Sequence, residues 1–324
     1  MNRLWKMASI LGLALSLIAG AGIAAAQEFP NKLVNLVIPY PPGGSAEAQA
    51  RIIAQKLGEL WNQPVVIINK PGGGTTIGAA FVAKSAPDGY TLYLASTSHT
   101  FSASLYKNVT YDAVKSFAPV SRYATSPIMI VAHPSAGVST LKELVDLAKA
   151  KPDTYAYAST STGASPHLAM EMFVSAVGIK LVHVPYKGQG PAVVAILGAQ
   201  TPYAVLDATT LPLVQSGKLK ALAVTSPQRW AQLPNVPTIA EFGVPGYECI
   251  NWSSILAPAG TPREIVRRIN ATVANALKSP DVKQRLNSQG FEPSPSTPEE
   301  LESFLAAEVK KYAKVIADAG IKVD

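Results

Sequence analysis

Residues 33–60 read LVNLVIPYPPGGSAEAQARIIAQKLGEL, an apolar run followed by a loop rich in proline and glycine and then by a periodic segment. The apolar run at 33–38 is rich in β-branched residues and ends at a proline, so it predicts a buried strand. Apolar residues recur at spacings of four and three from Ala46 to Leu60, which predicts an amphipathic helix. The stretch therefore predicts a strand, a rigid loop and a helix, with Ser45 as the helix cap.

The loop at residues 41–45 suits an anion. The first backbone N–H groups of a helix have no partner within the helix, and the helix dipole adds partial positive charge at the same end. A carboxylate or a phosphate is attracted to such a point. Taken by itself, the loop is equally open to interpretation as a simple tight turn.

The first 26 residues have the features of a secretory signal. Arg3 and Lys6 precede an uncharged run from Met7 to Ile23, and three alanines at 24–26 suit a signal peptidase. We expect cleavage after Ala26, with an uncleaved membrane anchor as the alternative. The only cysteine is Cys249, so no cysteine near the cleavage site can carry a lipid and no internal disulfide is possible. In a Gram-negative host the mature protein is predicted to be free in the periplasm.

The composition is that of a globular protein, with 48% hydrophobic and 15% charged residues. Without residues 1–26, the chain has 26 basic and 21 acidic residues, a formal charge of +5. This balance suits anionic small molecules, whereas nucleic acid requires a clustered basic stripe. We therefore expect no nucleic-acid partner, and we expect a monomer.

Predicted strands alternate with predicted helices along most of the chain, which argues for an α/β fold with parallel sheets. Two extended stretches break the alternation, one from Phe117 to Ala132 and one from Trp252 to Ala257. We interpret them as two crossings between two domains. Capping patterns at Thr140, Thr261 and Thr297 predict the starts of three helices, since each is followed three residues later by glutamate.

Hydroxyl groups cluster where predicted strands end. Residues 96–100 follow one such strand and residues 159–165 follow another. Open α/β sheets bind ligands at the carboxyl ends of their strands, so both clusters are candidates for a binding site. Asp207 ends a further predicted strand, where it either caps a neighbouring helix or faces a cleft.

Catalytic and nucleotide-binding motifs were sought without success. The glycine-rich loop at 72–78 has Ile77 where a dinucleotide fingerprint needs glycine or alanine, and the P-loop's Gly-Lys-Ser/Thr is missing. There is no Gly-x-Ser-x-Gly elbow, and the four histidines show no metal-ligand spacing. Cys249 is interpreted as a small buried hydrophobe. We expect no catalytic residue, no metal and no cofactor, and hence no enzyme.

Motifs spread over the mature chain resemble, in the same order, those of the solute-binding proteins of tripartite tricarboxylate transporters, the Bug family. The motifs are PPGG at 41–44 continuing to Arg51, NKPG at 69–72, APDGYT at 86–91, HVPYKG at 183–188, LAVTS at 222–226, LPNVPT at 233–238 and APAGTP at 257–262.

The resemblance implies a two-lobed periplasmic binding protein of type II topology with two crossing strands as its hinge. Residues 27–122 and 253–324 would form the first lobe, and residues 123–252 the second. The lobes would close on a small mono- or dicarboxylate, aliphatic or aromatic, and present it to an integral-membrane permease. A sensing subunit that reports ligand occupancy to a kinase is the alternative, and a secreted α/β hydrolase is a less favoured one.

The resemblance also implies ligand contacts. The chain has Glu47 where the family's motif usually has aspartate, and Ser45 and Ala46 where glycine and threonine are usual. Carried over residue by residue, the expected contacts are Gly43, Gly44, Ser45, Ala46, Glu47, Thr97, Ser98, His99, Ser159, Thr160, Gly163, Ala164, Ser165 and Asp207.

Overall fold

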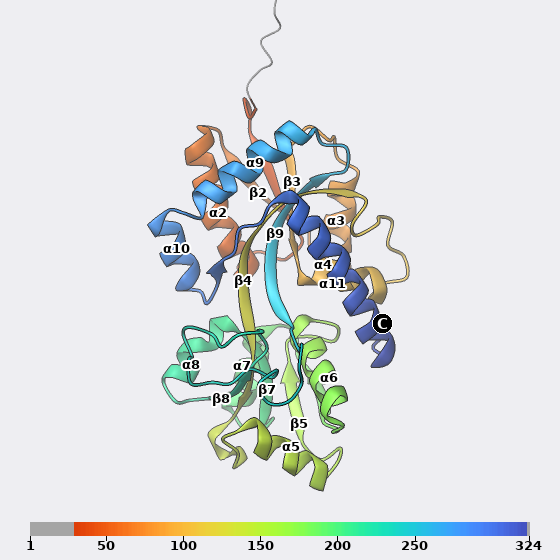
Figure 1. Ribbon diagram of the computed structural model, residues 1–324, viewed down its shortest axis with the longest axis vertical. Helices are drawn as coiled ribbons and strands as arrows, with labels where there is room; N and C mark the ends of the chain where they lie inside the picture. The colour runs from red at the N-terminus through yellow and green to blue at the C-terminus, as the bar shows by residue number, and fades with distance from the viewer. Residues whose placement is uncertain (1–28, 323–324) are drawn as a thin grey trace, which may run out of the picture.

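Two antiparallel strands connect two lobes in the computed structural model, which describes residues 29–322 (Figure 1). Strand β4 (Phe117–Ala132) starts in the first lobe and ends in the second, and β9 (Ile250–Pro258) returns beside it. The predicted signal peptide at 1–26 lies outside the described residues. Within residues 29–322, no helix has both the length and the apolar character needed to cross a membrane.

The sheet of the first lobe has the strand order β2-β1-β3-β9-β4. Strand β1 (Val34–Ile38) pairs in parallel with β2 (Val65–Asn69) and with β3 (Thr91–Ser96), as expected for strands joined through helices. Strand β9 is antiparallel to both β3 and β4, and the short β10 (Glu292–Pro293) pairs with β4. Insertion of the returning strand between β3 and β4 is the type II arrangement, so the predicted fold class is confirmed.

Helices cover both faces of this sheet. They are α2 (Ser45–Trp61), η1 (Gly73–Thr75), α3 (Thr76–Ala83), α4 (Thr97–Leu105), α9 (Arg263–Ala276) and α10 (Pro280–Asn287). Helices α2, α9 and α10 pack against one set of buried side chains of β1 and β3 and α3 packs against the other, whereas Phe101 of α4 packs in a cluster with second-lobe residues.

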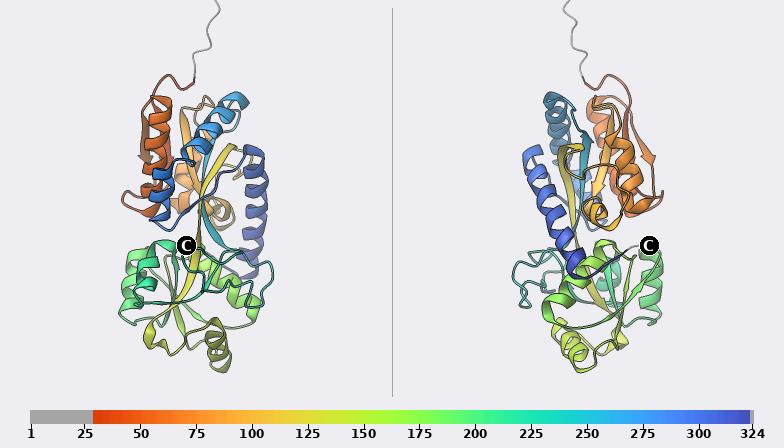
Figure 2. Two further views of the ribbon diagram at one scale, coloured as in Figure 1. Left: turned by 60° about the vertical axis from the view of Figure 1, so that its left-hand side comes forward. Right: turned by 90° about the vertical axis from the view of Figure 1, so that its right-hand side faces the viewer.

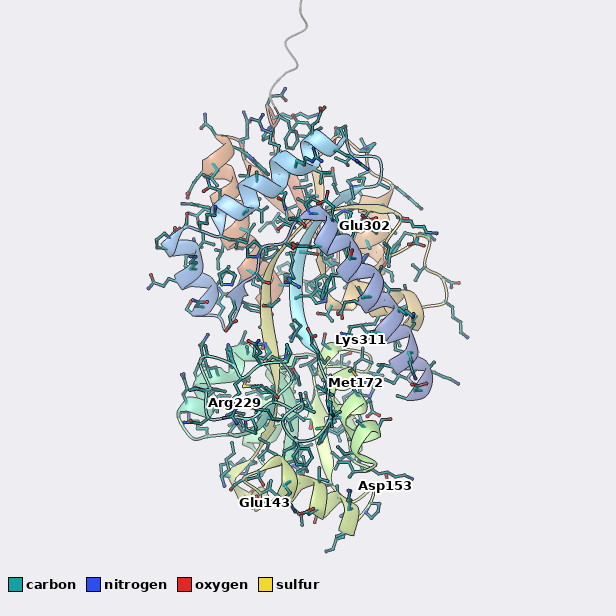
Figure 3. All side chains as sticks on the ribbon, viewed as in Figure 1. Glu143, Asp153, Met172, Arg229, Glu302 and Lys311 are labelled. Carbon is teal, nitrogen blue, oxygen red and sulfur yellow. The ribbon has the colours of Figure 1, made fainter. Side chains whose placement is uncertain are left out.

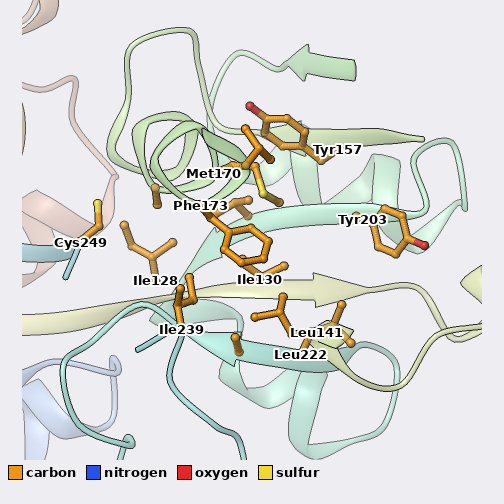
Figure 4. Close-up of a cluster of buried hydrophobic side chains, with 14 of the residues drawn as sticks. Ile128, Ile130, Leu141, Tyr157, Met170, Phe173, Tyr203, Leu222, Ile239 and Cys249 are labelled. Carbon is orange, nitrogen blue, oxygen red and sulfur yellow. The ribbon is translucent and has the colours of Figure 1, made fainter. Parts of the chain in front are cut away.

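The second lobe contains the end of β4 in a sheet where β8 pairs with one edge of β4 and β7, β5 and β6 follow on the other. Ile128 and Ile130 of β4 pack in one buried cluster with Phe173 and Ile239 (Figure 4). The elements of this lobe are η2 (Pro134–Ala136), α5 (Leu141–Ala150), β5 (Ala156–Ser159), α6 (Ser165–Val177), β6 (Val182–Pro185), α7 (Gln189–Leu197), β7 (Tyr203–Asp207), η3 (Ala208–Thr210), α8 (Leu211–Gln215) and β8 (Lys220–Val224).

The last helix, α11 (Pro298–Asp318), runs alongside both lobes (Figure 2). Leu301 and Leu305 belong to a core cluster of the first lobe, whereas Tyr312 and Ile316 belong to the core cluster of the second. Lys311, labelled in Figure 3, lies at the level where the two lobes meet. The lobe boundaries at 122/123 and 252/253 fall within β4 and β9 and stay a prediction, and α11 is shared between the lobes.

The predicted helix caps have mixed outcomes. Thr140 and Thr297 each accept a hydrogen bond from the backbone N–H of the glutamate three residues later, so both capping boxes are confirmed. The prediction for Ser45 is wrong, because Gly44 occupies the N-cap with an extended backbone and Ser45 is the first helical residue. The prediction for Thr261 is also wrong, because its hydroxyl donates to the carbonyl oxygen of Pro258 at 2.8 Å and Pro262 takes the N-cap.

Candidate ligand-binding site

A cavity of ≈ 380 Å³ lies between the lobes beside the crossing strands, and we call it the main cavity. Both lobes and β9 contribute to its wall. The lining residues are Tyr40, Pro41, Pro42, Gly44, Ser45, Ala46, Ser96, Thr97, Ser98, Thr160, Ala164, Ser165, Pro166, Asp207, Asn251, Trp252, Ser253 and Phe291.

Three helices begin at the main cavity. Helices α2 and α4 start from the first lobe with Gly44 and Ser96 as N-caps, and α6 starts from the second lobe with Ala164 as its N-cap. None of these N-caps makes a side-chain capping hydrogen bond. The N–H groups of the first turns are therefore left for another acceptor, and three positive helix ends converge on one space. This arrangement favours a carboxylate or a similar anion.

Asp207 is the one charged side chain among the residues that the structure places around the main cavity. Its carboxylate accepts hydrogen bonds from the N–H of Thr209 at 3.0 Å and from the amide of Gln189. Asp207 is also the N-cap of η3. Both alternatives considered for this residue therefore hold, since it caps a helical turn and lines the cavity.

Thr97 joins the start of α4 to the crossing strand β9. Its hydroxyl donates to the carbonyl oxygen of Ile250 at 3.2 Å and accepts from the N–H of Trp252 at 3.1 Å. Tyr40 makes a second link, because its hydroxyl lies 2.5 Å from that of Ser96. Burial raises the pKa of Tyr40. The Thr97 link holds the start of α4 against β9, and the Tyr40 link holds the loop after β1 against the end of β3.

Glu47 and Gly43 lie behind the main cavity. The Glu47 carboxylate accepts a hydrogen bond from the Gly43 N–H at 2.6 Å and pairs with Arg51, and the residue is only 4% exposed. The hydrogen bond from the Gly43 N–H is the main reason that the pKa of Glu47 lies below its usual range, and Arg51 lowers this pKa further. This geometry favours a role for Glu47 in holding the loop from Gly43 to Ser45 over contact with a ligand.

His99 lies outside the main cavity. The residue is fully buried, its Nε2 is 2.8 Å from the carbonyl oxygen of Ala113, and its ring stacks on Tyr111. Burial lowers the pKa of the His99 imidazole to about 4. His99 therefore occupies a packing position.

Ser159 is fully buried behind the second-lobe loop, and Gly163 is part of that loop without lining the main cavity. The Ser159 hydroxyl is 2.6 Å from Nε2 of His183, and the Gly163 N–H donates to Nδ1 of His167 at 3.0 Å. The two imidazole rings stack with centroids 3.8 Å apart. Burial lowers the pKa of His183 to about 4, and burial together with His183 lowers that of His167 to about 3. Neutral histidines thus hold the loop that contains Thr160 and Ala164.

The contribution of β9 to the cavity was not predicted from the sequence. Asn251, Trp252 and Ser253 all line it, although the strand from Trp252 was identified as a crossing. This contribution could have been predicted once the strand was identified as a crossing, because strands that connect two lobes pass along the floor of the space between them. Phe291 was missed as well, since it precedes a strand of two residues that has no recognisable pattern.

Comparisons with known proteins agree with this architecture. The profile of the tripartite tricarboxylate transporter family receptor matches residues 49–321. Protein BugT of Bordetella pertussis is 36% identical over 327 residues, covering 98% of each chain. The structure of the periplasmic binding protein BugD is 34% identical with a TM-score of 0.78, covering 91% of this chain and 99% of BugD. R. palustris Rpa4515, solved with adipate, is 34% identical with a TM-score of 0.81, covering 91% and 99%.

The profile match extends over both lobes and includes the starts of α4 and α6, and the match to BugT covers 98% of the chain. The family and the fold are those of periplasmic solute-binding proteins, and Rpa4515 has adipate bound. The chain therefore belongs to the tripartite tricarboxylate transporter receptor family, the Bug proteins.

Proposed function

We propose that this protein captures a small carboxylate between its lobes and delivers it to a tripartite tricarboxylate-type permease. The observation that carries the proposal is the convergence of three helix starts without side-chain caps on the main cavity. A carboxylate that accepts several backbone N–H groups gains charge-assisted hydrogen bonds of about 1.5–3 kcal/mol each. Adipate in the related Rpa4515 supports the same ligand chemistry.

The proposed ligand contacts are the sequence-predicted residues that surround the main cavity. They are Gly44, Ser45, Ala46, Thr97, Ser98, Thr160, Ala164, Ser165 and Asp207. Gly43, Glu47, His99 and Ser159 are assigned to the support of these contacts, on the hydrogen bonds and burial described above. Gly163 supports them through its hydrogen bond to His167 and also lines a neighbouring cavity.

Closure of the lobes about β4 and β9 would bury the carboxylate between α2 and α4 on one side and α6 on the other. Water would then be excluded, which strengthens the hydrogen bonds because the local dielectric constant falls. The closed form is the one proposed to dock on the permease. Cleavage after Ala26, absence of a lipid anchor, the monomeric state and the lobe boundaries belong to the same proposal.

Calorimetric titration with short aliphatic and aromatic acids, next to neutral and cationic solutes of similar size, tests the ligand class. Ser45→Asp adds a negative charge at the start of α2 and should weaken carboxylate binding by at least about tenfold, or about 1.4 kcal/mol. Asparagine has nearly the same shape as aspartate without the charge, so Ser45→Asn should lose much less of the affinity for the carboxylate. Binding of neutral or cationic solutes with no binding of any carboxylate would refute the proposal.

A further inference from the structure

A second cavity of ≈ 440 Å³ adjoins the main cavity, and we call it the side compartment. The two spaces share Tyr40, Pro41, Ser98 and Ala164 as lining residues, so they are neighbours at the start of α4. The side compartment extends from there toward the end of α4 and the glycine-rich loop before α3. A ligand whose carboxylate lies at the helix starts therefore has room for a body larger than the main cavity alone would hold.

Apolar and aromatic side chains form much of the wall of the side compartment, including Pro39, Phe101, Leu105 and Tyr106. Tyr106 is held against the backbone of Gly74, where a Cβ atom would lie 2.3 Å from the ring. Gly74 also has φ of +57°, which further favours glycine. The ring wall is therefore fixed by close packing and is suited to contact with an aliphatic chain or another ring.

Charge limits what this compartment can accept. Among the described residues that line it, no lysine, arginine, histidine, aspartate or glutamate is present. In the main cavity the one charged group is Asp207, which has the same sign as a ligand carboxylate. A second carboxylate placed in the side compartment would find hydroxyl groups but no cation to offset the loss of its hydration, whereas an uncharged chain gains from burial.

We propose that the physiological ligand has a carboxylate at one end and an uncharged apolar or aromatic body at the other, with the body in the side compartment. This inference rests on the proposed function, because it takes the helix starts as the carboxylate site. It narrows the ligand class from carboxylates in general to those without a charged far end.

Hexanoate and adipate provide a matched pair for calorimetry, since they differ only in whether the sixth carbon is a methyl or a carboxylate group. Hexanoate and 3-phenylpropanoate should bind the wild-type protein about tenfold more tightly than adipate. Tighter binding of adipate than of both monocarboxylates would overturn the inference and leave the proposed function intact. Failure of every acid to bind would overturn the proposed function, and the inference with it.

Leu105→Lys tests the location of the body. Leu105 is half-buried in the compartment wall, so a lysine there offers a cation to a second carboxylate. The variant should bind adipate more tightly than hexanoate, reversing the wild-type preference. Leu60→Lys is the matched control, because Leu60 is 41% exposed at the far end of α2, and it should keep the wild-type preference.

A thermal unfolding midpoint close to that of the wild-type protein, together with retained binding of propanoate, establishes that Leu105→Lys is folded. Propanoate is too short to reach the lysine and reports on the carboxylate site alone. If a folded Leu105→Lys variant keeps the wild-type preference, the body does not lie in the side compartment and the inference fails.

Discussion

Gly43 and Gly44 are adjacent in the chain but have different backbone requirements. Gly43 has φ of +87°, whereas Gly44 has φ of −85°, and a Cβ atom would meet nothing within 4 Å at either position. Only Gly43→Ala is therefore strained by its backbone. We expect this substitution to lower the free energy of unfolding by about 1 kcal/mol, and Gly44→Ala to lower it by clearly less. Urea unfolding of both variants measures these losses. Equal losses of unfolding free energy would contradict the conclusion that only Gly43 requires glycine.

Three buried or half-buried histidines with lowered pKa values predict that the protein loses stability in acid. His99, His167 and His183 have pKa values lowered to about 4, 3 and 4, chiefly by burial, whereas histidine in an unfolded chain titrates near 6.5. The unfolded state therefore binds more protons than the folded state between about pH 6.5 and about pH 4, and stability falls as the pH falls through this window.

Thermal unfolding midpoints measured across this window should decrease steadily toward low pH. His99→Gln replaces one of the three groups by a side chain that does not titrate, so it should flatten the dependence even if it lowers stability at neutral pH. A midpoint that stays constant from about pH 7 to about pH 4.5 would contradict the prediction.

At the level of single residues, the sequence could locate the loops that line the main cavity but not which side chains of each loop face it. Ser159 and Thr160 are neighbours with similar side chains, yet Ser159 is fully buried against His183 and Thr160 lines the main cavity. Their chemistry is the same, and the direction of each side chain depends on tertiary packing. His99 was predicted as a ligand contact together with Thr97 and Ser98, which it follows in the chain. Its side chain is instead fully buried outside the main cavity.

Among the elements, α11 has an unusual influence on the main cavity. Glu308 of this helix is 5% exposed and accepts a hydrogen bond from the indole N–H of Trp252 at 3.1 Å. Trp252 is itself buried and lines the cavity. A helix at the end of the chain therefore fixes a side chain in the floor of the site.

Replacement of Glu308 by methionine should leave the indole N–H without an acceptor and lower the free energy of unfolding by about 1–3 kcal/mol. Glu308→Gln retains an acceptor oxygen and is expected to lose less. Chemical unfolding monitored by tryptophan fluorescence compares the two variants. Equal destabilisation would mean that the interaction with Lys311, which pairs with Glu308, is the one that matters.

The starts of α9 and α11 show how well a local sequence pattern predicts a helix cap. Residues 261–264 and 297–300 both read Thr-Pro-x-Glu, yet only Thr297 forms a capping box. Thr261 lies three residues after the end of β9, and both its N–H and its hydroxyl donate hydrogen bonds to the carbonyl oxygen of Pro258. A contact with the preceding strand thus replaces the cap, and a local pattern does not contain that information.

For the molecule as a whole, the alternation of strands and helices and the two extended stretches were sufficient to predict two lobes with two crossings. The sharing of α11 between lobes was not predicted. Its apolar face is continuous along the helix, so Leu305 and Tyr312 follow the same pattern although they pack in cores of different lobes. Periodicity identifies a buried face and does not identify what covers it.

The proposed closure of the lobes predicts that the protein becomes more compact when it binds its ligand. With saturating ligand, small-angle scattering should give a smaller radius of gyration than for the free protein, because binding at helix starts from both lobes favours the closed form. Ser45→Asp at the same ligand concentration should keep the radius of the free protein. An unchanged radius at saturation in the wild-type protein would mean that binding and closure are not linked.

Cys249 offers a practical advantage for following this motion. Its thiol is fully buried, lies 3.4 Å from the hydroxyl of Tyr312, and has a pKa raised to about 11 by burial. Alkylating reagents react with thiolates, so the native cysteine is slow to label while the protein is folded. One new surface cysteine in each lobe can therefore carry a fluorophore pair without removal of Cys249, and energy transfer between the two dyes would report opening and closing in single molecules.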